Sequence, residues 1–191
     1  MPESATSLSA KTIFPGFASL LWLTQSNNGT TTHLLCHLDG QNVLGIAENG
    51  ETRFLKLPFP LGNTGFMYLD SKGRGWISAE QGLLMCYLPE TDRFVTFDLA
   101  EHLGSLPLTY AVYEDARHDI WVGTDNGAVK LEIGNLDLEK LETTADGVIK
   151  SSFKILKFQT IATDPQSLRH NFITAFCRRL CGSESGDEIV P

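Results

Sequence analysis

A repeat with fixed spacing restricts the folds open to this chain. The stretch YLDSKGRGWISAEQGLL, residues 68–84, returns without gaps as YEDARHDIWVGTDNGAV, residues 113–129. A third copy begins at NFITAFC, residues 171–177. The matched positions lie 45 residues apart and are Asp70 with Asp115, Trp76 with Trp121, and Gly82 with Gly127. Such a period predicts equivalent structural units, each packed against its neighbours.

The pattern inside the units is that of short β-strands. In AVKLE, residues 128–132, apolar and polar side chains alternate, as they do in a half-buried strand. FKILKF, residues 153–158, is a similar run. The Asn-Gly pairs at 49–50 and 126–127 favour tight hairpins, because both residues accept positive φ. Helical periodicity is confined to a possible turn around residues 137–142, so we expect an all-β fold.

Each unit contains about four strands. In the clearest copy we predict them at Phe66–Leu69, Gly75–Ala79, Leu83–Leu88 and Arg93–Asp98. Four strands in about 40–50 residues is the spacing of β-propeller blades. We expect the acidic residue and its turn to end the first strand of a blade. The strand centred on Trp76 or Trp121 then packs against the next blade, and the glycine turn sends the chain back.

The expected fold is therefore a partial β-propeller, with about three four-stranded blades plus the first strand of a fourth. The predicted divisions are a lead-in at 1–15, a divergent blade 1 at 16–60, blade 2 at 61–105, blade 3 at 106–165 with an insert at 134–150, the start of blade 4 at 166–177, and an irregular tail at 178–191.

The repeat resembles a known family. EDARHDIWVGTDNG, residues 114–127, is similar to the two-component regulator propeller repeat, and residues 158–176 resemble the stretch joining its successive blades. The resemblance covers residues 63–176, and the stretch Gly75–Ala79 departs from the Trp-x-Gly-Thr pattern. The structural repeat positions that it marks are Asp70, Trp76, Gly82, Asp115, Trp121, Gly123, Thr124 and Gly127.

The resemblance implies a sensory role. Such repeats usually form the extracytoplasmic sensing region of hybrid histidine-kinase receptors. It implies an unidentified small-molecule or glycan ligand, bound by loops at the mouth of the central channel. It also implies a partner, either the remainder of the receptor or another blade-bearing chain. The compartment is open on the sequence alone, since no clear signal peptide is present.

The fourth unit begins as expected at residues 172–177, but the Glu-Asp turn and Trp strand do not follow. Instead RRLCGSESGDEIVP, residues 178–191, is polar and unpatterned. We therefore hypothesise that the chain is a truncated or frame-shifted fragment of a longer receptor. A related alternative is that the chain is a remnant without a function of its own.

Charge and hydropathy exclude several partners. With 23 acidic and 15 basic residues the net charge is −8, so we expect no nucleic-acid or anionic-membrane partner. The apolar stretch at residues 12–23 is interrupted by Pro15 and Gly16 and is too short to span a bilayer. We interpret it as a strand leading into the fold and expect no membrane span in this chain.

Few residues suggest a catalytic or metal-binding site. HLLCH offers His33, Cys36 and His37, but His33 and His37 share one face of a strand and Cys36 the other, and no spaced ligands complete a zinc site. A strand with incidental histidines is the preferred interpretation. The cysteines Cys36, Cys86, Cys177 and Cys181 are expected to be free buried thiols, with a Cys177–Cys181 pair as the alternative.

Glu114 and Asp115 could be taken as paired carboxylates for acid–base work, but the same aspartate recurs at position 70. A repeated structural role in a turn explains this better. His118 in that turn is expected to be solvated. The acidic run at 136–146 is expected to be a solvated loop, with a partner-contact surface as the alternative.

Three functional classes remain. A non-catalytic sensory or interaction module, without metal or cofactor, is preferred because nucleophile elbows, metal-binding helices and phosphate loops are missing from the sequence. A propeller enzyme of lyase or quinoprotein type would need histidines or carboxylates at equivalent blade positions. The five histidines do not recur at the 45-residue period. The third class is the nonfunctional remnant.

Overall fold

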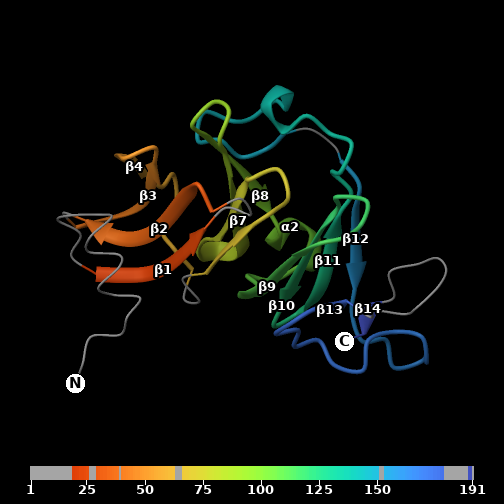
Figure 1. Ribbon diagram of the computed structural model, residues 1–191. Helices are drawn as coiled ribbons and strands as arrows, with labels where there is room; N and C mark the ends of the chain where they lie inside the picture. The colour runs from red at the N-terminus through yellow and green to blue at the C-terminus, as the bar shows by residue number, and fades with distance from the viewer. Residues whose placement is uncertain are drawn as a thin grey trace, which may run out of the picture.

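The structure is a computed structural model that describes residues 19–25, 29–38, 40–62, 66–150, 153–178 and 189–190. Three four-stranded antiparallel sheets follow one another along the chain (Figure 1). In each sheet the strands pair in sequence order. The all-β partial β-propeller predicted from the repeat is confirmed, and each sheet is called a blade below.

The strands have the following bounds. Blade 1 contains β1 (Ser19–Gln25), β2 (Thr31–Leu38), β3 (Gln41–Glu48) and β4 (Glu51–Lys56). Blade 2 contains β5 (Met67–Leu69), β6 (Gly75–Ser78), β7 (Leu83–Leu88) and β8 (Arg93–Asp98). Blade 3 contains β9 (Thr109–Glu114), β10 (Ile120–Thr124), β11 (Gly127–Leu131) and β12 (Ile155–Phe158).

The two Asn-Gly pairs occupy different positions in their hairpins. Between β3 and β4, Asn49 and Gly50 both have positive φ (52° and 82°) and make the two-residue turn that the sequence predicted. Between β10 and β11, Thr124 pairs with Gly127, so the turn residues are Asp125 and Asn126. Gly127 has φ 104°, and a Cβ there would lie 2.3 Å from the Phe158 carbonyl oxygen. This glycine is needed for close approach to β12, which corrects the expected turn.

Apolar side chains pack between the blades rather than within one sheet. One cluster joins blades 2 and 3 and includes Trp76 and Phe97 together with Val112 and Val122. A smaller cluster joins blades 1 and 2 through Leu35 and residues of β6 and β7. Trp76 is completely buried, and its ring centroid lies 5.4 Å from that of Phe97. Burying such side chains is the main stabilising contribution at these interfaces.

The insert between β11 and β12 is not the solvated loop that the sequence suggested. It contains the 3₁₀ turn η2 (Leu138–Lys140), in which Leu138 is only 3% exposed. Its backbone then pairs with β8 of blade 2, where the Thr96 N–H donates to the Gly147 carbonyl (2.9 Å) and the Ile149 N–H donates to the Thr96 carbonyl (2.9 Å). The apolar residues of the acidic run pack the insert against blade 2. The many acidic residues of this run suggested a solvated loop instead.

Two further short helices lie in the described residues and were not predicted. They are η1 (Glu80–Gly82) and α2 (Ala100–Leu103). α2 ends at Gly104, which has φ 70°. A four-residue helix is too short to show helical periodicity, so the sequence pattern could not reveal it. Within the described ranges, no helix is long and apolar enough to cross a membrane.

The start of the fourth unit is shorter as a strand than expected. Residues 171–176 are extended coil, and β13 covers only Cys177–Arg178, paired with β14 (Ile189–Val190). The Ile173 N–H donates to the Thr124 carbonyl at the end of β10 (2.8 Å), but no ladder is formed by residues 172–176 within the described part of the chain. The irregular tail therefore includes a strand. The lead-in 1–15 and Cys181 lie outside the described residues.

Candidate functional site

The repeated aspartate organises a turn in blade 2. One carboxylate oxygen of Asp70 accepts hydrogen bonds from the N–H groups of Lys72 (3.0 Å) and Arg74 (2.9 Å). The other oxygen accepts from the Trp76 indole Nε1 (2.9 Å). Asp70 thereby links the turn to the buried tryptophan six residues later.

Blade 3 repeats the arrangement. Asp115 accepts from the N–H groups of Arg117 (2.9 Å) and Asp119 (3.0 Å) and from Trp121 Nε1 (3.0 Å). Burial alone would raise the pKa of Asp115, but the hydrogen bonds from Trp121 and Lys130 lower that pKa below its usual value. Asp115 is thus held as a carboxylate and is a poor candidate for a general acid.

The two blades neutralise this carboxylate with different cations. In blade 2, Arg74 Nε lies 2.5 Å from Asp70 and its guanidinium lies over the Trp76 ring. In blade 3 the cation is Lys130 of β11, whose Nζ lies 2.9 Å from Asp115. In the repeat Asp119 stands opposite Arg74, so the sequence shows that blade 3 lacks this arginine. It does not show that Lys130, on strand β11, takes its place.

The other repeat positions contact backbone or neighbouring side chains. Thr124 Oγ1 donates to the Gly127 carbonyl (2.8 Å) and accepts from the Asn126 N–H (3.0 Å). A Cβ at Gly123 would meet Ile173 at 2.8 Å, and one at Gly82 would meet Pro107 at 2.6 Å. These positions close turns and allow close packing of segments.

A Ser–Glu–His cluster lies between blades 2 and 3. Glu114 Oε1 lies 2.7 Å from Ser71 Oγ and 2.8 Å from His118 Nδ1, while Ser71 Oγ is 3.2 Å from that same Nδ1. In a hydrolase triad the serine and the carboxylate engage opposite ring nitrogens, so this histidine is not placed as a relay. His118, expected to be solvated, is half exposed and hydrogen-bonded.

Glu114 is also a weak base. Burial favours a raised pKa, yet hydrogen bonds from Ser71 and His118 outweigh it and lower the pKa of Glu114. The side chains of Glu114 and Asp115 make separate contacts, with blade 2 and with their own turn. They do not form an acid–base pair.

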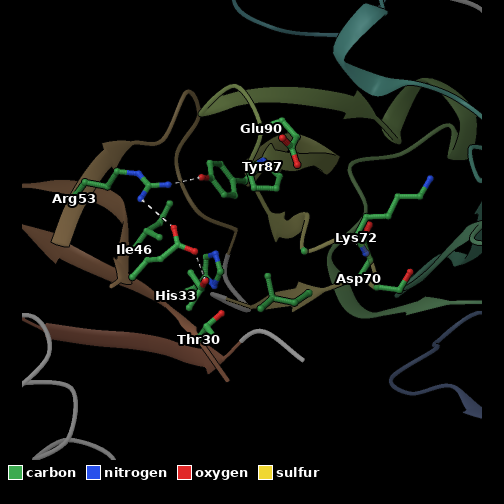
Figure 2. Close-up of a pocket in the computed structure, with 14 residues that line it drawn as sticks. Thr30, His33, Ile46, Arg53, Asp70, Lys72, Tyr87 and Glu90 are labelled. Carbon is green, nitrogen blue, oxygen red and sulfur yellow. Dashed lines mark hydrogen bonds and ion pairs between the residues drawn. The ribbon is translucent and has the colours of Figure 1, made fainter. Parts of the chain in front are cut away.

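One candidate site is a cavity of about 650 Å³ between blades 1 and 2 (Figure 2). Blade 1 contributes His33, Glu48 and Arg53, and blade 2 contributes Lys72 and Tyr87 among others. Its volume falls in the range of small-molecule sites. Asp70 is the one repeat position among its lining residues.

A polar network spans the blades at this cavity. Figure 2 shows Arg53 reaching from blade 1 toward Tyr87 of blade 2, where Nη2 lies 3.2 Å from the phenol oxygen. Arg53 Nη2 also donates to Asp92 (3.0 Å), and the Tyr87 hydroxyl donates to the same carboxylate oxygen (2.6 Å). Burial, and then the hydrogen bond with Asp92, raise the pKa of Tyr87 to about 12. The phenol therefore stays protonated and acts as a donor.

His33 is the buried polar group of the cavity wall contributed by β2. Its residue is 3% exposed, and its Nδ1 is buried without a hydrogen-bond partner. Burial, with Arg53 nearby, lowers the pKa of His33 to about 4, so the ring is neutral at pH 7. Leaving such an atom unpaired is costly, and sites of this kind call for an explanation.

The HLLCH histidines do not assemble a metal centre. His37 is exposed and its Nδ1 lies 3.1 Å from Asn42 Oδ1, while Cys36 is a buried free thiol. No group of three His, Cys, Asp or Glu side chains in the described part of the chain could hold a metal ion. Cys86 is also buried and free, but Cys177 is exposed, which corrects the expectation that all the thiols are buried.

A second cavity of about 460 Å³ lies between blade 2 and the insert of blade 3. Lys72, Pro89 and Glu90 line both cavities. Lys72 Nζ donates to the Gly134 carbonyl (3.1 Å), so the segment that separates the two cavities is hydrogen-bonded to the insert. Sequence reasoning missed both cavities because their walls come from separate blades.

Known structures resemble this fold. The extracellular domain of the putative hybrid two component system BT3049 from B. thetaiotaomicron aligns with a TM-score of 0.52 and 17% identity, over 88% of this chain and 19% of that one. The extracellular domain of BT4673 from the same organism aligns with a TM-score of 0.51 and 14% identity, over 85% and 19%. At this identity the likeness shows the fold alone.

The chain thus spans about a fifth of the length of these neighbours. No family model matches the sequence. No curated protein matches it either. The class defined by fold and comparison is a partial β-propeller, similar to the extracellular domains of two-component sensors.

Proposed function

We infer that the chain is a non-catalytic sensory or interaction module from the propeller sensing region of a two-component receptor. The observation that carries this proposal is the set of successive blades, which is similar to the extracellular domains of putative hybrid two-component systems. The resemblance of residues 114–127 to the family repeat supports it independently. An extracytoplasmic location and a small-molecule or glycan ligand belong to the same proposal.

The exposed side of blade 3 supports a blade-bearing partner. Trp76 is completely buried beneath blade 3, whereas the equivalent Trp121 is only partly buried. Trp121 packs on Phe158 (5.0 Å) and Phe176 (6.4 Å), which leaves part of its surface for a further blade. We propose that this blade belongs to the remainder of the receptor or to another chain.

The non-catalytic part of the proposal rests on the site geometry. The Ser71–Glu114–His118 cluster lacks the order of a nucleophilic triad, and each side chain ties blade 2 to blade 3. A lyase or quinoprotein site gathered from several blades would need recurring ligands, and the described histidines do not recur.

The fragment hypothesis is tested on the coding DNA across and downstream of the Cys177 codon. We expect another frame, or a continuation, to encode further Trp-Gly-Thr blades, a membrane span and a kinase. An intact frame ending here in several independent genomic copies would overturn the fragment hypothesis. Purified chain that is unfolded on its own would favour the nonfunctional remnant.

A further inference from the structure

We propose that the cavity between blades 1 and 2 binds a small neutral molecule carrying hydroxyl or primary amide groups. The proposal deepens the sensory function, on which it rests for its biological meaning. It places the ligand between two blades instead of at the mouth of a central channel.

The first argument is the unpaired imidazole. His33 lines the cavity, and its Nδ1 is buried without a partner. A ring that remains neutral at pH 7 offers one nitrogen as donor and the other as acceptor. Because Nδ1 is shielded from solvent, a ligand reaches it only when the ring turns toward the cavity. A ligand hydroxyl or amide can then pair with either tautomer, because each group both donates and accepts.

The second argument is a gap between two charged side chains. Arg53 Nη1 lies 4.0 Å from Glu48 Oε2, which is an ion pair but too long for a hydrogen bond. The other Glu48 oxygen accepts from Thr31 Oγ1 (2.8 Å), and Arg53 Nη2 is committed to Tyr87 and Asp92. One ligand hydroxyl between these groups would accept from Nη1 and donate to Oε2.

The third argument is the balance of charge. Glu48 and Arg53 of blade 1 and Glu90 and Lys72 of blade 2 line the cavity. The Lys72 ammonium points away from Arg53 (Figure 2) and donates to the Gly134 carbonyl of the insert. A ligand carboxylate would meet a carboxylate from either blade, and a ligand ammonium would meet the Arg53 guanidinium. Repulsion of this kind selects against both signs, so a neutral polar ligand fits best.

A ligand in this position would contact both blades at once. It would bridge β2 and β3 of blade 1 to the β5–β6 turn of blade 2, beside the Arg53–Asp92 tie. Occupation would therefore favour one arrangement of the two blades, because the ligand binds that arrangement better.

The binding test uses the full chain at pH 7, with calorimetric titration and NMR shifts as readouts. The neutral probes are myo-inositol, a polyol, and N-acetylglycinamide, an amide. The charged comparators are ethanolamine, a cation at pH 7, and malate, a dicarboxylate. We expect at least one neutral probe to bind and to shift the His33 ring resonances, and the arm that succeeds tells polyol from amide. Failure of both neutral probes at about 10 mM, or equal binding of a charged one, would overturn the proposal.

Matched variants locate the site. His33→Gln and Glu48→Gln should each weaken binding by up to about tenfold, since each removes about one hydrogen bond. His37→Gln is the control, because His37 lies on the same strand but outside the cavity. Equal weakening by His37→Gln, or none by Glu48→Gln at its half-exposed rim position, would contradict the assignment. Glu48→Gln keeps the test valid if His33→Gln does not fold.

The failure of this proposal is distinguishable from failure of the proposed function. If no probe binds while the DNA continues into a kinase, the receptor role stands and this cavity is not the ligand site. If a neutral probe binds while no kinase follows, the site stands without the receptor.

Discussion

The two interfaces between blades are built differently. Trp76, Phe97 and the insert of blade 3 pack together between blades 2 and 3. The neighbouring β5–β6 turn is held by hydrogen bonds to Asp70. Between blades 1 and 2 the apolar cluster is smaller, and the blades are linked by a network in which half-exposed Arg53 and Asp92 meet the buried Tyr87 beside a cavity. The first interface has the features of a structural joint. The second leaves room and an unpaired imidazole, which makes it the better place for a ligand.

The sharpest test of this contrast is Trp76→Ala. Removing a completely buried tryptophan should reduce the free energy of unfolding by about 3–5 kcal/mol. Trp121→Ala, at the equivalent but partly exposed position, should cost clearly less. Urea unfolding of both variants is the measurement, and equal losses would show that the two repeat positions are packed alike.

Asp70→Asn should cause the next largest loss in the free energy of unfolding. The aspartate side chain is fully buried, and its loss of charge leaves the buried Arg74 without an ion-pair partner. Breaking a buried pair from one side costs about 3–5 kcal/mol. Asp115→Asn should cost less, because Lys130 retains Asp119 at 3.0 Å. Chemical denaturation compares the two, and a larger loss for Asp115→Asn would contradict the expected order.

His33→Gln should change how the free energy of unfolding depends on pH under acidic conditions. The pKa of His33 is lowered from 6.5 to about 4 in the folded chain, so the unfolded state binds protons first as the pH falls. Stability from the neutral ring is complete above pH 6.5 and declines from there down to about pH 4, by on the order of 3 kcal/mol. Thermal unfolding across this range should be flatter in the variant than in the parent and in His37→Gln.

Arg53→Met should have a modest effect, because the side chain is 41% exposed. We expect a loss of about 1 kcal/mol, reflecting hydrogen bonds to Asp92 and Tyr87 that water partly replaces. The measurement is the midpoint of urea unfolding. A loss as large as that of Trp76→Ala would show that this network, rather than packing, holds blades 1 and 2 together.

Ser71→Ala should have the smallest effect. It removes the hydroxyl contact with Glu114 but keeps the backbone bond from the Ser71 N–H, which is 2.6 Å from the same carboxylate. We expect about 0.5–1 kcal/mol. Because the serine is not placed as a nucleophile, the variant should leave hydrolysis of an activated ester at the background rate. Loss of a measurable hydrolysis in Ser71→Ala would reopen the enzyme alternative.

Local patterns predicted blade 2 closely. Its first strand was expected at Phe66–Leu69 and lies at Met67–Leu69, while β7 and β8 have the predicted bounds. These strands are short, largely apolar runs separated by turn residues, so local sequence specifies them. The insert was interpreted wrongly because its acidic residues outnumber the few leucines that dock it onto blade 2.

The candidate site was beyond the reach of sequence patterns. His33, Arg53 and Tyr87 are ordinary strand residues in the sequence, and only the packing of blade 1 against blade 2 brings them together. The exchange of Arg74 for Lys130 as the counter-charge was hidden because Lys130 lies on β11, and only the strand pairing of blade 3 brings it to Asp115.

The sequence by itself determined the blade: its period, its strands and the aspartate and tryptophan that repeat at fixed spacing. These depend on residues close in the chain, where backbone geometry and side-chain alternation suffice. The tertiary structure decided which cation neutralises each aspartate, how the insert docks, and where a cavity remains. The insert and the cavity depend on side chains from different blades, and the Lys130–Asp115 pair depends on two strands of one blade, so no local pattern fixes these distances.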